Sequence, residues 1–181
     1  MKAISDAGAN YGLQYNWKKL ELMATGCNAS AILKPGGCPI PEKKSMVYLG
    51  SVLASDGSIG AELSRRIGLA RSVFDSLQRI WSHSVLSTKR KLTIYAACVE
   101  SALLYSLHTS WLRKHELSRL NAFQARCLRN ILSISHSYVS RVSNATVLQR
   151  AQRIKLSDLF LQRQLILFGD IARKGNDRPV R

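Results

Sequence analysis

The acidic side chains that could hold a catalytic metal are scattered along this chain. Six aspartates are present, and no two of them are adjacent. Two-metal catalysis needs carboxylates that hold both ions a few ångströms apart, so the sequence offers no obvious site of that kind. The aspartates are Asp6, Asp56, Asp75, Asp158, Asp170 and Asp177.

Cysteine and histidine also lack the spacing of a metal site. The four cysteines (Cys27, Cys38, Cys98 and Cys127) contain no C-x-x-C pair, and the four histidines share no helical face. These cysteines therefore read as reduced, structural thiols rather than zinc ligands or disulfides. No glycine-rich phosphate loop and no nucleophile elbow occurs. We expect this chain to bind no cofactor.

Among the side chains that could bind a ligand, the cationic ones stand out, because Lys and Arg far outnumber Asp and Glu. The formal net charge is +16 and the pI is about 10.3. Residues 61–181 hold 21 of the 27 Lys and Arg residues but only seven of the 11 carboxylates. Most of these cations are arginines, whose planar fork fits phosphate better than the point charge of lysine. The charge predicts a polyanionic partner, with nucleic acid the first choice.

A membrane surface is the competing partner for a basic chain. That interpretation needs an amphipathic helix with aromatic anchors or a lipidation signal, and neither is evident. Residues 92–107 form the longest apolar tract, which contains Glu100 and is short for a membrane span. No secretory signal opens the chain. We expect an intracellular protein, nuclear or cytoplasmic, that is not secreted.

The first third of the chain has short strand patterns. Gly12 fits the end of a first helix. Apolar and polar residues alternate over 13–17 and 20–24, which predicts a half-buried strand interrupted near the lysines. Proline and glycine over 34–41 predict a loop, and 46–53 predicts a second strand that ends at the turn formers of 55–58.

From Ile59 onward the apolar residues recur at helical spacing. The fold class is therefore predicted to be α+β and mostly helical, with a small β-hairpin or strand segment followed by a four- to five-helix bundle. The change of period divides the chain into domains 1–58 and 59–181. Expected helices cover 59–81, 88–106, 114–133, 144–153 and 158–173.

Several details accompany these helices. Glu62 and Arg66 are expected to pair on the flank of the first. The second is small or apolar on every face, which predicts a central, buried helix. Asn144 and Ser157 are the expected caps of the last two.

Several different short motifs follow one another along the chain. Gly12-Leu13 opens a stretch in which Asn16, Lys18 and Lys19 precede Leu20. Tyr48-Leu49-Gly50 follows about thirty residues later. Next come Leu86-Ser87 with Lys91, then Leu104-Tyr105 with Trp111, and finally 168–173, which reads Phe-Gly-Asp-Ile-Ala-Arg.

Over residues 8–181 this order resembles the part of a LINE-type (non-long-terminal-repeat) retrotransposon reverse transcriptase downstream of its catalytic aspartates. The family has threonine where Leu20 stands, glycine where Ser106 stands and histidine where Asp170 stands. The resemblance implies a residual palm segment over 1–58, with a motif D-like strand and a primer-grip-like hairpin, and a basic thumb-like region over 59–181. The missing upstream polymerase half would then be a possible partner.

The resemblance also assigns roles. Lys19, with Lys18 as its alternate, takes the auxiliary position near the phosphates of the incoming nucleotide, although a solvated lysine pair fits equally well. Magnesium is expected only in a complete polymerase, so this chain should bind template–primer duplex without incorporating nucleotides. The expected nucleic-acid-binding residues are Tyr48, Leu49, Gly50, Arg65, Arg66, Lys89, Arg90, Lys91, Arg119, Arg126 and Arg129.

Two other functions remain open at this point. The chain could be a stand-alone basic helical nucleic-acid-binding protein, or an inert fragment of a decayed element. The sequence leaves open the choice between RNA and DNA, the oligomeric state, any cellular role and whether a catalytic half precedes this chain.

Overall fold

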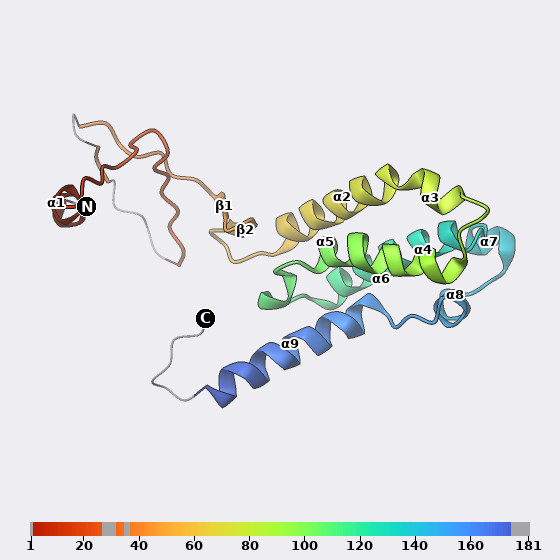
Figure 1. The fold of residues 1–181 in the computed structure, drawn as a ribbon. Coiled ribbons are helices and arrows are strands. Elements are labelled where there is room, and N and C mark those ends of the chain that lie inside the picture. The colour runs from red at the N-terminus through yellow and green to blue at the C-terminus, as the bar shows by residue number, and fades with distance from the viewer. Residues whose placement is uncertain (1, 27–31, 35–36, 175–181) are drawn as a thin grey trace. The chain divides into compact units, whose positions relative to one another are not determined.

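A computed structural model describes residues 2–26, 32–34 and 37–174, and the chain divides into two compact units (Figure 1). The N-terminal unit spans Met1–Ser58 and the helical unit spans Ile59–Arg181. The change from one unit to the next coincides with the change of hydrophobic period in the sequence. The fold is α+β and mostly helical, which confirms the predicted fold class.

The N-terminal unit has little regular structure. Helix α1 covers Lys2–Ala9, and Gly12 follows with a positive φ of 71°, a conformation that glycine adopts without strain. Strands β1 (Ser45–Tyr48) and β2 (Ser51–Ala54) form an antiparallel hairpin. Among its described residues, Ile40 is the only buried hydrophobic side chain. This unit therefore has almost no core of its own.

The strands predicted over 13–17 and 20–24 were wrong. Asn16 accepts hydrogen bonds from the next residues instead, through its side-chain Oδ1 from the Lys18 amide (3.2 Å) and through its carbonyl from the Lys19 amide (2.9 Å). An asparagine side chain that bonds its own backbone competes with strand pairing. Only Leu22 makes an isolated bridge, to Glu42. Lys18 and Lys19 consequently lie in a turn.

The single strand predicted over 46–53 is in fact the β1–β2 hairpin. Tyr48 pairs with Ser51, which leaves Leu49 and Gly50 as a two-residue turn. Both have positive φ, 47° and 79°, as a type I′ turn requires. Glycine tolerates this conformation, but leucine does not favour it. The turn was therefore not predicted, because Leu49 fits the apolar alternation of a continuous strand. Asp56 then accepts a hydrogen bond from the Ser58 amide at 2.9 Å, which confirms the predicted turn there.

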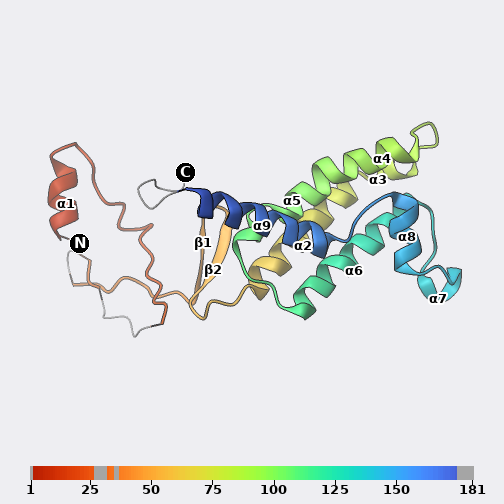
Figure 2. The same ribbon diagram turned by 90° about the horizontal axis from the view of Figure 1, so that it is seen from below.

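The helical unit contains the helices that follow Ile59, seen from two directions in Figures 1 and 2. They are α2 (Gly60–Ser76), α3 (Gln78–Ser82), α4 (Thr88–Ile94), the π-helix η1 (Tyr95–Glu100), α5 (Ser101–Leu104), the 3₁₀ turn η2 (Leu107–Thr109), α6 (Lys114–Ile131), α7 (Ser137–Ser140), α8 (Asn144–Ala151) and α9 (Leu156–Arg173). Helix α2 packs against η1, α5 and α6, while α6 also contacts α8 and α9. Helix α6 is thus the central member.

One apolar core joins these helices. It includes the residues predicted to face inward, such as Leu63 and Phe74 of α2, Leu103 of α5 and Leu120 of α6. Phe74 stacks on Trp81 of α3, with ring centroids 5.0 Å apart. Since most of these helices, though not α7, contribute an apolar face to the same core, the helical unit can be stable through its own packing.

The helix predicted over 88–106 differs from the expectation. Ser87 caps α4 by accepting a hydrogen bond from the Arg90 amide, but the helix widens into η1 and α5 ends at Leu104. Ala97 and Cys98 are exposed, so this segment is not buried on every face. Small side chains on the outer face were therefore a poor indicator of burial. Ser106 lies beyond the helix with a positive φ of 58°.

Both predicted caps of the last two helices were wrong. Ser143 caps α8 by accepting a hydrogen bond from the Thr146 amide at 3.1 Å, one residue before Asn144. Helix α9 begins at Leu156 after Lys155, which provides no side-chain cap. Ser157 is buried, and its amide donates to Oδ1 of Asn121 in α6 at 3.0 Å. The Ser157 hydroxyl accepts a hydrogen bond from Nδ2 of Asn121, and Oδ1 of Asn144 accepts one from Arg129, each at 3.0 Å, so these side chains make tertiary contacts instead of caps.

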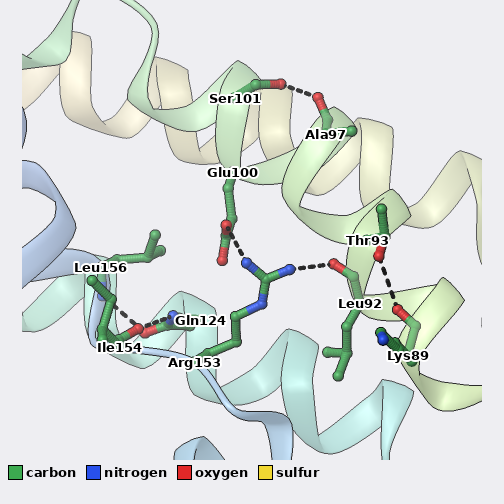
Figure 3. A network of polar contacts seen from close by, with 10 residues as sticks. All are labelled: Lys89, Leu92, Thr93, Ala97, Glu100, Ser101, Gln124, Arg153, Ile154 and Leu156. Atoms are coloured by element: carbon green, nitrogen blue, oxygen red, sulfur yellow. Dashed lines mark hydrogen bonds and ion pairs between the residues drawn. The ribbon is translucent and has the colours of Figure 1, made fainter.

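A polar network connects α4, η1 and α6 to the segment between α8 and α9 (Figure 3). Arg153 donates to the Leu92 carbonyl at 2.6 Å and lies 3.6 Å from the Glu100 carboxylate. Gln124 of α6 donates to the Ile154 carbonyl and accepts from the Leu156 amide, at 2.8 and 2.9 Å. These bonds fix the start of α9 against α6.

We expect Glu100 to make a pH-dependent contribution to the stability of the helical unit. Burial raises the pKa of this carboxyl above its ordinary value of 4.5, although Arg153 acts in the opposite direction. The native state then binds the proton more tightly than the unfolded state, so stability is lost as pH rises from 4.5 through the raised pKa. Denaturant unfolding of the wild type and Glu100→Gln across pH 4–8 should show the wild type losing stability relative to the variant. A stability difference independent of pH would contradict this assignment.

The cysteines should differ sharply in reactivity. Cys38 and Cys98 are exposed, whereas burial raises the pKa of Cys127 to about 12. Because the thiolate is the reactive form, alkylation of Cys127 at pH 8 should be about 10³-fold slower than that of Cys98. Timed iodoacetamide labelling with peptide mass spectrometry measures both rates in one sample. Equal rates would mean that α6 is not packed as described. Cys27 lies outside the described residues.

Candidate nucleic-acid interface

The surface of the helical unit is more basic than its composition alone indicates, because several carboxylates are buried. Glu62, Glu100 and Glu116 lie in the interior, each beside a hydrogen-bond donor. Among the described residues only two cations, Arg66 and Arg129, are buried. Most of the other described arginines and lysines of this unit are exposed, together with Asp75, Asp158 and Asp170.

Helix α6 presents the most regular part of this surface. Arg119, Ala122, Arg126 and Asn130 recur at steps of three and four, so they share one face, and all four are exposed. We call this set the α6 ridge. Arg119 and Arg126 stand about 10 Å apart along the helix axis at 1.5 Å per residue. The small side chain of Ala122 between them leaves room for a phosphate backbone to approach.

Hollows flank the ridge on both sides. On the α2 side, Arg71, Asp75 and Gln78 line a cavity of about 280 Å³ together with Arg126 and Asn130. On the other side, the segment 134–137 and Asn144 line an open cavity of about 490 Å³ together with the same two ridge residues. Arg71 is exposed and brings a third arginine to the ridge. We call the ridge plus Arg71 the basic face.

Arg119 also ties the basic face to α2. Its Nη2 donates to the Ser64 hydroxyl at 2.9 Å, and that hydroxyl donates to the Gly60 carbonyl at 2.8 Å. The bond uses one corner of a guanidinium that has five donors. Arg119 therefore keeps donors for a phosphate while its position is fixed.

The predicted phosphate contact at Arg66 was wrong. Arg66 is only 5% exposed, and its Nε donates to Glu62 at 2.5 Å. Its guanidinium also lies over the Tyr105 ring, 4.8 Å from the centroid. The expected flank position of the Glu62–Arg66 pair is wrong for the same reason. The pair is internal and joins α2 to the residue after α5.

The predicted surface contact at Arg129 was also wrong, because its guanidinium points inward. Nη1 donates to the Ser135 carbonyl (2.9 Å) and the Ser140 hydroxyl (3.4 Å). Nη2 donates to the Val142 carbonyl (2.6 Å) and to Oδ1 of Asn144 (3.0 Å). These four bonds hold the chain between α6 and α8, so Arg129 is a positioning residue.

The other expected cations lie at different places in the helical unit. Lys89 and Arg90 are exposed in the first turn of α4. Lys91 is half-buried and donates to the Trp81 carbonyl at 2.7 Å, at the end of α3. Arg65 is partly exposed and lies 3.4 Å from Glu62. Arg119 and Arg126 thus share the α6 ridge, whereas Lys89 and Arg90 belong to α4 and Arg65 belongs to α2.

The expected residues of the N-terminal unit are all on its surface. Lys18 and Lys19 are exposed in their turn, and Tyr48, Leu49 and Gly50 are exposed at the tip of the β1–β2 hairpin. Tyr48 is 60% exposed and Leu49 is 80% exposed. Two consecutive residues of the hairpin tip thus expose large apolar side chains.

The sequence pattern did not identify Arg71, Asn130 or His136 as site residues. Arg71 could have been found, because it lies one residue from the buried Ala70 and thus beside the core stripe of α2. His136 comes to the cavity only because Arg129 fixes the following segment, and no local pattern reveals that.

Among the described residues no group of three or more His, Cys, Asp or Glu side chains is placed to hold a metal ion. The same part of the chain has no helix both long and apolar enough to cross a membrane. Neither family models nor curated proteins nor solved structures give a match to this chain.

Proposed function

We propose that this chain binds a nucleic-acid duplex of the template–primer kind through the basic face, as the palm-end and thumb part of a LINE-type reverse transcriptase. The observation that carries the proposal is the α6 ridge with Arg71. It places two exposed arginines on α6 and a third on α2, in a unit where three of the six described carboxylates are buried.

The binding mode follows from this chemistry. Exposed guanidinium groups contact phosphate oxygens and release condensed counterions, which gives affinity without base recognition. Arg119 and Arg126 can meet one strand across about three nucleotide steps, since phosphates rise 3.4 Å per nucleotide along the duplex axis. We expect slight sequence preference. RNA–DNA hybrid is the ligand that the resemblance implies.

Two structural details support the resemblance. Tyr48-Leu49-Gly50, the tripeptide like that of the primer-grip hairpin, does form a hairpin tip. Ser106, which stands where the family has glycine, has the positive φ that glycine tolerates best. Both details concern backbone conformation and not the residue types of the motifs.

Nucleotide incorporation is not part of the proposed function. The two-metal step needs paired carboxylates, and no two aspartates are adjacent in this sequence. Lys19 keeps its proposed auxiliary role only beside a catalytic half that supplies those carboxylates.

Anisotropy of a fluorescent RNA–DNA hybrid, titrated with the full chain at 50 mM salt, tests the proposal. Saturable binding that a random-sequence duplex also shows is the expected result. Absence of binding at this salt concentration would overturn the proposed function. Addition of magnesium and deoxynucleotides to the same complex should extend no primer above a heat-treated control, and extension would contradict the inactive assignment.

A further inference from the structure

The cavity on the far side of the α6 ridge from Arg71 has the size of a small-ligand site. Its volume is about 490 Å³, and ligand pockets commonly measure roughly 300–1,000 Å³. It lies between α6 and the segment that Arg129 fixes, so its walls are held by tertiary hydrogen bonds. Its lining includes Arg126, Arg129, Asn130 and His136.

This cavity has an uncompensated positive charge in its wall. Arg129 is 7% exposed, and all four of its hydrogen-bond acceptors are neutral oxygens. Within the part of the chain that the structure describes, it has no carboxylate partner, and no acid lines the cavity. A buried cation without an anion is costly. A bound anion would relieve that cost, and Arg126 offers a second guanidinium at the same wall.

The cavity on the α2 side of the ridge is a useful contrast. It contains Asp75, which can balance Arg71 and Arg126 there. The two hollows share Arg126 and Asn130, yet only the one beside Arg129 lacks an acid. An anion is therefore favoured on the Arg129 side.

An aromatic pair extends from the same cavity. His136 lines it and stacks on Tyr138, with ring centroids 5.9 Å apart and planes 11° from parallel. Tyr138 is 75% exposed, so its outer face is open to another flat ring. Single-stranded nucleic acids bind to just such a combination of cations and exposed aromatic rings, because every base has a π-face.

We propose that this cavity binds one unpaired nucleotide of a strand that lies on the basic face. Arg126 contacts its phosphate, the charge of Arg129 stabilises that phosphate from behind, and the base continues the His136–Tyr138 stack. The inference rests on the proposed function, because the strand reaches the cavity from the α6 ridge. The ligand class is a single-stranded overhang, and fully paired duplex would leave the stack empty.

The test compares a blunt RNA–DNA hybrid with the same hybrid carrying a four-nucleotide overhang, by anisotropy with the full chain. The wild type should bind the overhang form at least about five-fold more tightly. Tyr138→Ala should abolish this gain and leave blunt affinity unchanged. Trp111→Ala, which removes another exposed aromatic ring, should keep the gain. Circular dichroism checks that each variant is folded.

The outcomes separate the two proposals. Blunt binding without an overhang gain, or a gain that survives Tyr138→Ala, overturns the nucleotide site and leaves the proposed function intact. Failure of both ligands to bind overturns the proposed function itself. Micromolar adenosine monophosphate that cancels the gain would make a free nucleotide the ligand, and would overturn the strand assignment. Inorganic phosphate at that concentration should have no effect.

Photocrosslinking gives an independent readout. 5-Iodouracil placed in the overhang should crosslink to residues 136–138, as mapped by peptide mass spectrometry. Crosslinks found only outside 122–144 would overturn the site even if the affinities behave as expected.

Discussion

Replacement of Trp81 by alanine should lower the free energy of unfolding of the helical unit by about 3–5 kcal/mol. Trp81 is 3% exposed and stacks on Phe74, and its indole N–H donates to the Phe74 carbonyl at 2.8 Å. The alanine variant loses that packing and the indole hydrogen bond, and it leaves a cavity. Urea unfolding followed by circular dichroism at 222 nm measures the loss.

Trp111 provides the matched control, because it is 79% exposed. Trp111→Ala should change the same free energy by less than about 0.5 kcal/mol. Equal losses for the two variants would contradict the packing of α3 on α2, because burial is what distinguishes the two tryptophans.

Neutralisation of the basic face should weaken duplex binding by about 10²-fold at 0.1 M salt, since each lost phosphate contact removes about one released counterion. The variant is Arg71→Gln, Arg119→Gln and Arg126→Gln together. All three side chains are exposed, so the fold should persist. Anisotropy of the labelled hybrid gives the dissociation constants.

An equal loss of charge elsewhere provides the control. Arg150→Gln, Lys155→Gln and Lys174→Gln remove three exposed cations of the helical unit that are not part of the basic face. The fold-loss in duplex affinity of this control variant should be less than about a tenth of that of the basic-face variant, because salt screens charges that do not contact the duplex. Equal losses for both variants would mean that net charge, and not the basic face, sets the affinity.

The helical unit could be predicted from the sequence because its signal is local and repeated. Leu63, Ala70, Phe74 and Trp81 recur at helical steps and all are buried. Leu120, Cys127 and Leu128 do the same in α6. Once several helices each present an apolar face, a shared core follows from their packing, and the mostly helical fold class is confirmed.

The structure of the N-terminal unit and the burial of individual cations could not be predicted, because they depend on contacts that the hydrophobic pattern of the sequence does not contain. Residues 13–17 alternate as a strand would, but Asn16 forms a turn there instead. Among the described residues no neighbouring strand pairs with that segment. Arg66 and Arg129 look like surface cations in the sequence. Their burial depends on acceptors up to fifteen residues away, such as Asn144 for Arg129.

The same reasoning applies to the candidate site. Arg119 and Arg126 lie seven residues apart, so their shared face follows from helix geometry alone. The contribution of Arg71 depends on the packing of α2 against α6, and the cavity beside Arg129 depends on the segment that returns to α8. Sequence spacing predicts what one helix presents, but not what a second element adds to it.

The salt dependence of duplex binding tests the central claim most directly. Dissociation constants of the full chain for the labelled hybrid are measured between 50 and 200 mM salt. With about five phosphate contacts, log K should fall against log salt with a slope of about −4 to −5, a loss of about 10²–10³ in affinity over this range. The basic-face variant should show a slope less steep by about 2 to 3. A flat salt response of the wild type would contradict the account, because the exposed arginines would then be a solvated surface without a polyanionic partner.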